Sequence, residues 1–281
     1  MKDLIIGCSD NYDWDTLKYW VNSIKMTGFL GDIVLIVFRA SKDTIEKLVE
    51  NGVNVIALSM DSEGDANHTS QIPVHVERFF HIYNYLRLNP YRWVVTTDVK
   101  DIVFQKNPIE FIMQESPWMD TYLIFSSESL KYKDEPWGFN NVLEGYGPFW
   151  QSTMAEKTIY NVGILAGHGN YIRDLCQEIF LMSVNRPIGI VDQASFNIII
   201  DGETYKKVGT YLGGNSKWAC NLGTTMDPNK IESFRPNLLD FEPIVVGDEV
   251  QNRQNDPYYI VHQYDRVPGL REKIYQKFGG E

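Results

Sequence analysis

Short apolar runs alternate with segments of helical spacing over the first hundred residues, and this alternation constrains the fold more than any other feature of the sequence. Residues 32–38 read Asp-Ile-Val-Leu-Ile-Val-Phe, which has the length and β-branched composition of a buried strand. The segment 14–24 instead places Trp, Leu, Val and Ile at the spacing of a helix with one apolar face. We expect strands over 3–7, 32–38, 53–58 and 91–97, with a helix in each intervening segment, the last over 74–88.

Strands that are separated by helices connect through right-handed crossovers and pair mostly in parallel. The sequence therefore predicts an α/β fold with a mostly parallel, twisted sheet flanked by helices. Ligands of such sheets bind beyond the carboxyl ends of the strands. The residues that directly follow the predicted strands, 8–12, 59–61 and 98–101, are thus the first candidates for a functional site.

The second half of the chain is less regular. Residues 126–157 are rich in aromatic side chains without a clear period. This composition indicates a compact segment outside the regular alternation of strands and helices, either a binding loop or a satellite hydrophobic cluster. Beyond it, we expect a strand over 158–165, helices over 170–184 and about 191–200, and short strands near 242–246 and 258–261.

Charge and composition exclude several classes of partner. Lys and Arg number 26 against 37 Asp and Glu, a formal net charge of −11, which argues against a nucleic-acid partner. No apolar run approaches the roughly 20 residues of a membrane span, and residues 1–8 turn polar too early for a signal peptide. The three cysteines are odd in number and far apart, which argues against a disulfide framework. We therefore expect a soluble, cytoplasmic protein.

Two carboxylates follow the strand predicted over 91–97. Asp98 ends this apolar run, and Asp101 precedes a second one. Anionic groups at the rim of a buried sheet are costly unless something cationic meets them, and carboxylate oxygens suit Mg²⁺ or Mn²⁺. The alternative is a capped turn in which Lys100 pairs with one of the two aspartates.

A second polar group follows the strand predicted over 258–261. His262 is either a hydrogen-bonded structural residue or a nitrogen ligand that completes a metal site with Asp98 and Asp101. Arg266 can contact phosphate oxygens, or it can form a salt bridge with a neighbouring acid.

Two further segments suit sugar hydroxyl groups. In the run Asn161-Val-Gly163 the small residues let a ligand approach the strand, and the Asn161 amide can bind hydroxyls. The glycines that follow do not make a dinucleotide fingerprint, because they lie in the middle of the chain. Asp192 opens a helix, where the macrodipole favours a carboxylate, but its neighbour Gln193 has no such structural reason.

These segments together resemble the GT-A nucleotide-sugar glycosyltransferases. The resemblance is to the retaining family-eight type, which includes glycogenin and bacterial galactosyltransferases, and to related nucleotide-diphospho-sugar transferase-like proteins. It implies a GT-A, Rossmann-like fold in a single domain, 1–281, with residues 1–105 as the nucleotide-binding half and 106–281 as the donor-sugar and acceptor half, the latter with an irregular acceptor-side portion. It also implies a Mn²⁺ or Mg²⁺ cofactor.

The resemblance assigns a role to each segment. It implies nucleotide binding by Cys8, Asp10, Asn11, Tyr12, Arg78 and Asp98; donor-sugar binding by Asn161, Gly163, Asp192 and Gln193, the last two catalytic; and metal binding by Asp98, Asp101 and His262. The metal motif here is Asp-x-x-Asp rather than the family's Asp-x-Asp. Arg266 takes the place of a phosphate-binding lysine only by analogy.

The function expected from these features is transfer of a sugar from a UDP- or GDP-linked donor to a hydroxyl group of an acceptor such as a glycan. Retention of configuration is favoured over inversion by the resemblance alone; inversion would require a carboxylate base, with Asp192 or Asp265 as first candidates. Three tryptophans, Trp137, Trp150 and Trp218, are candidates for the acceptor side, with core packing as the alternative. The competing function is non-catalytic binding of a nucleotide-sugar or glycan on the same fold.

Overall fold

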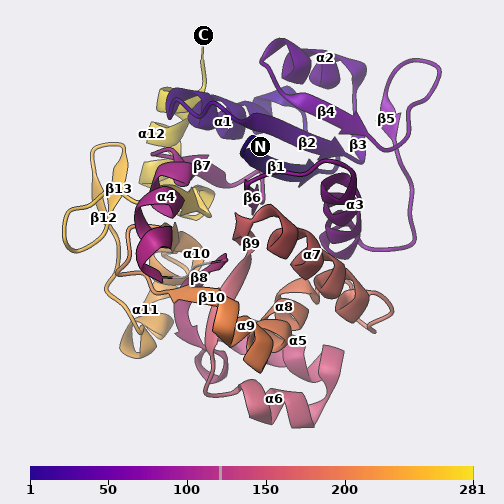
Figure 1. The fold of residues 1–281 in the computed structure, drawn as a ribbon. Helices are drawn as coiled ribbons and strands as arrows, with labels where there is room; N and C mark the ends of the chain where they lie inside the picture. The colour runs from indigo at the N-terminus through magenta and orange to yellow at the C-terminus, as the bar shows by residue number, and fades with distance from the viewer. Residues whose placement is uncertain (120–121, 281) are drawn as a thin grey trace.

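The computed structural model describes residues 1–119 and 122–280 and is built around one large sheet. Its strands are β1 (Leu4–Ser9), β2 (Asp32–Val37), β4 (Asn54–Ala57), β6 (Trp93–Thr97), β8 (Leu123–Lys131), β9 (Thr158–His168) and β10 (Gly209–Leu212). They lie in the order β10-β8-β9-β6-β1-β2-β4 (Figure 1). Only β9 runs antiparallel to its neighbours in this sheet. The predicted mostly parallel α/β sheet is therefore confirmed.

Helices bury both faces of the sheet. One face packs against α1 (Trp14–Met26), α2 (Lys42–Glu50) and α4 (Pro108–Met119), and the other against α3 (Val74–Leu88), α7 (Gly169–Ser183) and α8 (Asp192–Ile200). In β1, Ile5 belongs to the first of these cores, while Leu4 and Ile6 belong to the second. Because successive side chains of a strand point to opposite faces, a strand buried on both sides must be apolar throughout.

A second, three-stranded sheet lies beside the first. It contains β7 (Ile102–Phe104), β11 (Ala219–Asn221) and β14 (Ile260–His262) in the order β11-β14-β7. The antiparallel register pairs His262 with Ile102, directly after Asp101. The parallel register pairs His262 with Asn221. This small sheet therefore brings the end of the chain to the end of β6.

The remaining elements are short and peripheral. β3 (Arg39–Ala40) pairs with β5 (Ala66–Asn67), and β12 (Ile244–Val246) pairs with β13 (Glu249–Gln251). The other helices are α5 (Pro136–Tyr146), α6 (Pro148–Met154), α9 (Glu203–Val208), α10 (Leu222–Thr225), α11 (Ile231–Phe234) and α12 (Pro268–Phe278), with one-turn 3-10 helices at Tyr132–Asp134, Arg235–Asn237 and Tyr264–Arg266. No helix within the described part of the chain combines the length and the apolar character of a membrane span.

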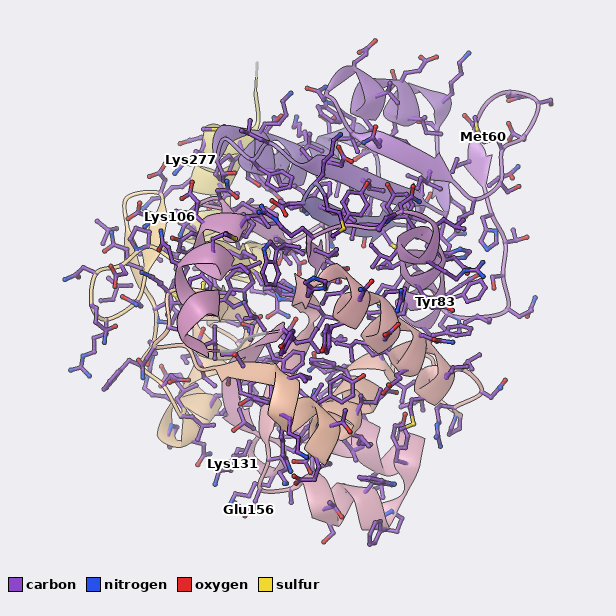
Figure 2. All side chains as sticks on the ribbon, in the orientation of Figure 1. Met60, Tyr83, Lys106, Lys131, Glu156 and Lys277 are labelled. Atoms are coloured by element: carbon purple, nitrogen blue, oxygen red, sulfur yellow. The ribbon has the colours of Figure 1, made fainter. Side chains whose placement is uncertain are left out.

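Some of the sequence predictions on local structure need correction. The segment 126–157, predicted to be irregular, forms the end of β8 followed by α5 and α6. The start of α5 is fixed by Pro136 and by the Glu135 carboxylate, which accepts a hydrogen bond of 2.5 Å from the Gly138 amide. In Figure 2, Lys131 and Glu156 lie at the outer end of this region and form an ion pair of 3.1 Å. The sequence also gave no sign of α4, α12 or most of β8, which has polar residues within its buried run.

Candidate active site

A cleft of about 570 Å³ opens beyond the carboxyl ends of β1 and β6. It is lined from the first half of the chain by Cys8, Tyr12, Arg78, Asp98 and Asp101, among others, and from the second half by Asn161, Gly163, Asp192, Gln193 and His262, among others. Because β1 and β6 are parallel neighbours, the segments that follow them lie side by side. Most of the site residues predicted from the sequence thus face one cavity.

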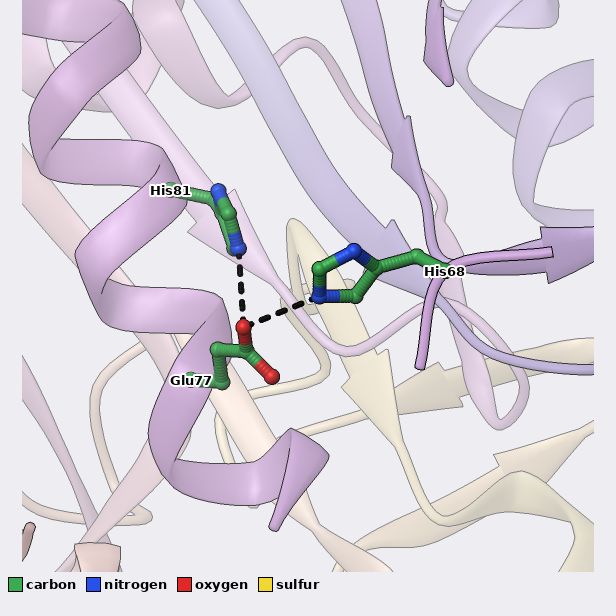
Figure 3. A group of neighbouring side chains, drawn as sticks. All are labelled: His68, Glu77 and His81. Atoms are coloured by element: carbon green, nitrogen blue, oxygen red, sulfur yellow. Dashed lines mark hydrogen bonds and ion pairs between the residues drawn. The ribbon is translucent and has the colours of Figure 1, made fainter. Parts of the chain in front are cut away.

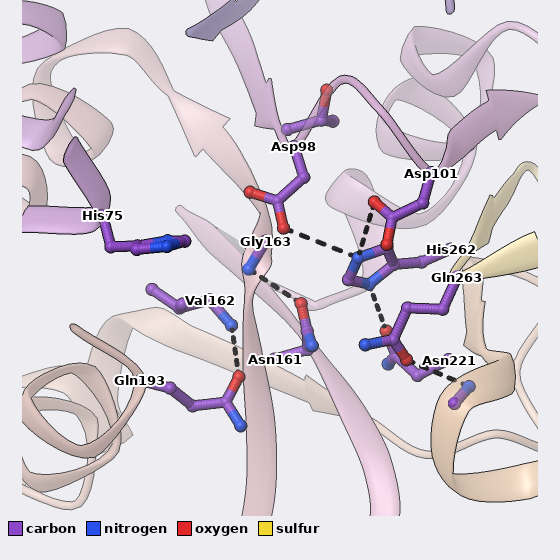
Figure 4. A network of polar contacts seen from close by, with 12 residues as sticks. His75, Asp98, Asp101, Asn161, Val162, Gly163, Gln193, Asn221, His262 and Gln263 are labelled. Carbon is purple, nitrogen blue, oxygen red and sulfur yellow. Dashed lines mark hydrogen bonds and ion pairs between the residues drawn. The ribbon is translucent and has the colours of Figure 1, made fainter. Parts of the chain in front are cut away.

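Asp98, Asp101 and His262 meet at the floor of this cleft (Figure 4). His262 Nε2 lies 3.5 Å from Asp98 Oδ2 and 3.6 Å from Asp101 Oδ1. On the other side of the ring, Nδ1 lies 2.9 Å from Asn221 Oδ1, so Nδ1 donates a hydrogen to that carbonyl oxygen. This contact directs Nε2 toward the two carboxylates. The histidine is only 2% exposed, so its orientation is fixed by packing.

The three groups interact strongly. Burial by itself would lower the pKa of His262, but Asp101 and Asp98 outweigh it and raise that pKa to about 10. Burial likewise opposes the charge of Asp98, yet Arg78 and His262 hold the pKa of this carboxyl well below its usual range. Asp98 therefore stays ionised throughout the neutral range.

Arg78 connects the floor of the cleft to its far wall. Its guanidinium group forms an ion pair with Asp98 through Nη1 and a second one of 2.9 Å with Asp192 Oδ2 through Nη2. Burial opposes the charge of Arg78, but the two carboxylates outweigh it and keep the pKa of this side chain above its ordinary value. Asp192 is 3% exposed and starts α8, so its carboxylate has two favourable contacts, with the helix N-terminus and with Arg78. The sequence suggested only the first.

Amides and a buried acid form the wall next to Asp192. Glu128 Oε1 accepts hydrogen bonds of 2.6 Å from Asn161 Nδ2 and 3.2 Å from Gln193 Nε2. Glu128 lines the cleft, is 6% exposed, and has its pKa raised by burial. Sequence reasoning missed Glu128, because it lies within β8, whose polar residues gave no strand pattern. Sequence reasoning also missed Asn221, because no sequence pattern links this residue to His262.

Gly163 gives Asp98 room against β9. A Cβ atom at residue 163 would lie 2.5 Å from Asp98 Oδ2 and 2.8 Å from Asn161 Oδ1. The backbones are also joined, because the Asp98 amide donates a hydrogen bond of 2.8 Å to the Gly163 carbonyl. The glycine is therefore required for close approach of the carboxylate to the strand.

The predicted nucleotide-binding segment lies at one end of the cleft. Cys8, Asp10 and Tyr12 line it, whereas Asn11 does not and adopts the left-handed conformation with φ of 60°. Arg39 donates hydrogen bonds of 2.7 and 2.6 Å to the Asp10 carboxylate. Burial raises the pKa of Cys8 to about 12, so this side chain is a neutral thiol.

The predicted acceptor-side tryptophans have different surroundings. Trp137 is 52% exposed and lies at the edge of the cleft. Trp150 is half-buried against the hydrophobic cluster around α5 and α6 and does not line the cleft. Trp218 is fully buried, with its ring centre 5.0 Å from that of Phe111, so it belongs to the core and not to the cleft. Core packing, the alternative considered for these residues, accounts for Trp218.

Arg266 lines the cleft, but its guanidinium group also lies 3.3 Å from Asp265 Oδ1. Lys100 and Lys230 line the cleft as well. With Arg78, they place four cationic side chains in a cleft that also holds seven carboxylates, so an anionic ligand would need a divalent cation beside it.

The donor set at the floor of the cleft fits a divalent cation. Two carboxylate oxygens and one imidazole nitrogen lie within 4.8 Å of one another. The hydrogen bond from His262 Nδ1 to Asn221 leaves the Nε2 lone pair free for a metal when the ring is neutral, an arrangement common for metal-binding histidines. Oxygen-rich sites of this composition suit Mn²⁺ or Mg²⁺.

Comparisons with known proteins agree with the fold. No family model matches the sequence, and no curated protein is significantly similar to it. Among solved structures, the WbbM bifunctional glycosyltransferase in its apo form aligns with a TM-score of 0.54 at 13% identity, over 99% of this chain and 52% of that one. Mouse xyloside xylosyltransferase 1, also apo, aligns with a TM-score of 0.53 at 10% identity, over 92% of this chain and 97% of that one. The chain has the GT-A fold.

This chain spans about half the length of WbbM. A third structure, glucosyl-3-phosphoglycerate synthase from Mycobacterium tuberculosis in complex with Mn²⁺, uridine diphosphate and glucosyl-3-phosphoglycerate, aligns with a TM-score of 0.45 at 14% identity, over 75% of this chain and 70% of that one. At that TM-score it adds nothing to the fold assignment, which rests on the first two.

Proposed function

We propose that this protein is a metal-dependent glycosyltransferase that moves a sugar from a UDP- or GDP-linked donor to a hydroxyl group of a glycan or similar acceptor. The observation that carries the proposal is the convergence of Asp98, Asp101 and His262 in a cleft of a GT-A fold, next to amide and carboxylate groups suited to a sugar. Residues 1–105 would bind the nucleotide, and residues 106–281 the sugar and the acceptor.

The diphosphate would lie over the floor of the cleft. Asp98, Asp101 and His262 would hold Mn²⁺ or Mg²⁺, which, when bound, neutralises charge on a leaving diphosphate as a Lewis acid. Lys100 and Arg266 line the same cleft and would pair with the outer phosphate oxygens. Arg78 is occupied by two carboxylates, so its role is to position Asp98 rather than to bind phosphate.

The sugar would lie against Gln193, Asn161 and Glu128. Gln193 and Asn161 offer amide groups for hydroxyls, and both are held by the Glu128 carboxylate. A carboxylate beside the anomeric carbon stabilises the positive charge that develops there during glycosyl transfer. Glu128 would serve in this role, in addition to the predicted residues Asp192 and Gln193.

The surroundings of Asp192 and Asp265, the two acids expected from the sequence as possible inverting bases, favour retention of configuration. An inverting enzyme needs a free carboxylate base on the face opposite to the leaving group. Asp192 is held in an ion pair by Arg78, and Asp265 is absent from the residues that line the cleft. We therefore propose that the leaving phosphate accepts the proton of the acceptor hydroxyl on the same face.

The test is turnover with a panel of UDP- and GDP-sugars, with Mn²⁺ or with EDTA, measured as released nucleoside diphosphate. We expect Mn²⁺-dependent release with at least one donor, and its loss in Asp101→Asn. Asp43→Asn is the matched control, because Asp43 is an exposed aspartate on α2 that pairs only with Lys47 among the described residues. Unchanged activity of Asp101→Asn would refute the metal assignment; metal-dependent binding of a donor without turnover would favour the binding-protein alternative.

A further inference from the structure

A second group of potential metal ligands lies outside the cleft. His68 follows β5, while Glu77 and His81 lie one turn apart on α3, so all three side chains point into the space between the loop and the helix (Figure 3). Both histidines direct Nε2 at the same carboxylate oxygen, Glu77 Oε1, at 3.0 Å from His68 and 3.3 Å from His81. None of the three lines the cleft.

Hydrogen bonding leaves this group incomplete. Glu77 is 6% exposed, and its second oxygen, Oε2, is buried without a hydrogen-bond partner in the described part of the chain. A buried carboxylate oxygen without a partner destabilises the folded state. Because both histidines contact Oε1, they leave the hydrogen-bonding capacity of Oε2 unfilled.

Both nitrogen–oxygen distances of this group fit a tetrahedral ion. Zinc binds imidazole nitrogen and carboxylate oxygen at about 2.0–2.1 Å, which places neighbouring ligand atoms about 3.3 Å apart. The two nitrogen–oxygen distances, 3.0 and 3.3 Å, are close to this value. The buried ring of Phe38 contacts both imidazoles edge-on, with ring centres 5.6 Å from His68 and 5.5 Å from His81, and so restricts their orientation.

We propose that His68, Glu77 and His81 form a zinc site that is separate from the cleft. Two imidazoles and one carboxylate are a set typical of Zn²⁺, whereas the two carboxylates and one imidazole of the cleft favour harder ions. The ion would join the segment after β5 to α3 at the residue before Arg78, which holds Asp98 and Asp192. The site would therefore stabilise the helix that positions the cleft.

The first test uses the unmodified protein, stripped of metal and loaded with one equivalent of ZnCl₂. X-ray absorption at the zinc edge counts the imidazoles bound to the ion. The proposed site supplies two imidazoles, whereas the group of Asp98, Asp101 and His262 in the cleft supplies one. Two imidazoles support the proposal, and one or none overturns it. This readout does not depend on the folding of any variant.

The second test removes the competing site. In Asp101→Asn, we expect one tightly bound Zn²⁺. Adding His81→Asn removes a ligand, so the zinc affinity should fall by more than the roughly 10- to 100-fold that is typical when a group hydrogen-bonded to a ligand is removed. Adding His168→Asn instead is the matched control, because His168 ends β9 and belongs to neither group of ligands. Equal zinc affinity in the His81 and control variants, both verified as folded by circular dichroism, would overturn the proposal.

Discussion

Adding one methyl group at residue 163 tests the proposed metal site without removing any ligand. The new Cβ of Gly163→Ala would lie 2.5 Å from Asp98 Oδ2, whereas carbon–oxygen contacts are comfortable at about 3.3 Å. The Asp98 carboxylate must therefore move by about 0.8 Å. Because this carboxylate is the end of a side chain that is 33% exposed, it can move while the fold is kept.

A displacement of this size matters for a metal ion. Ligand distances in metal sites are fixed to within about 0.2 Å, and lost supporting contacts cost about 10- to 100-fold in metal affinity. That range corresponds to about 1.4–2.8 kcal/mol of binding free energy. We therefore expect Gly163→Ala to weaken Mn²⁺ binding by this factor, measured by calorimetry, and to lower Mn²⁺-dependent release of nucleoside diphosphate accordingly.

The matched control is Gly269→Ala. Residue 269 lies in the first turn of α12, and a Cβ there would meet no described atom within 4 Å. Alanine at this position should leave Mn²⁺ affinity unchanged and leave the stability equal or slightly higher. If Gly163→Ala bound Mn²⁺ within twofold of the unmodified protein, the proposed contact between β9 and the metal-binding carboxylate would be wrong.

Three further predictions concern the wall and the edge of the cleft. Arg78→Ala leaves two carboxylates without their cation, so we expect a loss of about 3 kcal/mol in the free energy of unfolding, measured with urea, together with loss of transfer; stability within 0.5 kcal/mol of the unmodified protein would contradict this. Burial raises the pKa of Glu128 above its ordinary value of 4.5. The charged carboxylate therefore destabilises the folded state at pH values above this raised pKa, and the destabilisation disappears below pH 4.5. Glu128→Gln should thus raise the melting temperature at pH 7–8, with the gain fading toward pH 4.5, while transfer is lost; an equal gain at both pH values would refute the assignment. Trp218→Ala should lower the free energy of unfolding by about 3–5 kcal/mol. Trp137→Ala should change it by less than about 0.5 kcal/mol and raise the KM for the acceptor several-fold. The reverse pattern would place Trp137 in the core and Trp218 on the acceptor side.

Local patterns predicted the main strands and helices of the first hundred residues accurately. The helix expected over 74–88 is α3 with the same bounds, and the Ser41 hydroxyl caps α2, as serine commonly does before the first residue of a helix. These elements were predictable because their strands are buried on both faces and their helices on one, so each has a clear period. The second half was harder, since β8 buries Ser126, Ser127 and Glu128 within the core and so has no simple period.

Val49 shows where local reasoning failed. Its position next to Leu48 in the sequence would allow it to face the core, but it is 56% exposed, while Leu48 and Thr44 are buried. Adjacent residues of a helix point about 100° apart, and on this helix the sequence did not indicate which of the two would face the core. Trp218 is a similar case, since its aromatic ring suits both a sugar-binding wall and a core.

The sequence by itself determined the parallel strands of the first hundred residues, the edge at which ligands bind, and most of the polar residues that gather there, because strand ends and parallel pairing follow from local periodicity. Only the tertiary structure decided how those residues are paired. The Arg78 contact with two carboxylates, the Glu128 contact with Asn161, and the orientation of His262 by Asn221 each join segments that are far apart in the chain. Such contacts depend on side-chain directions and on the register of strands that meet only after folding, and no local pattern encodes them.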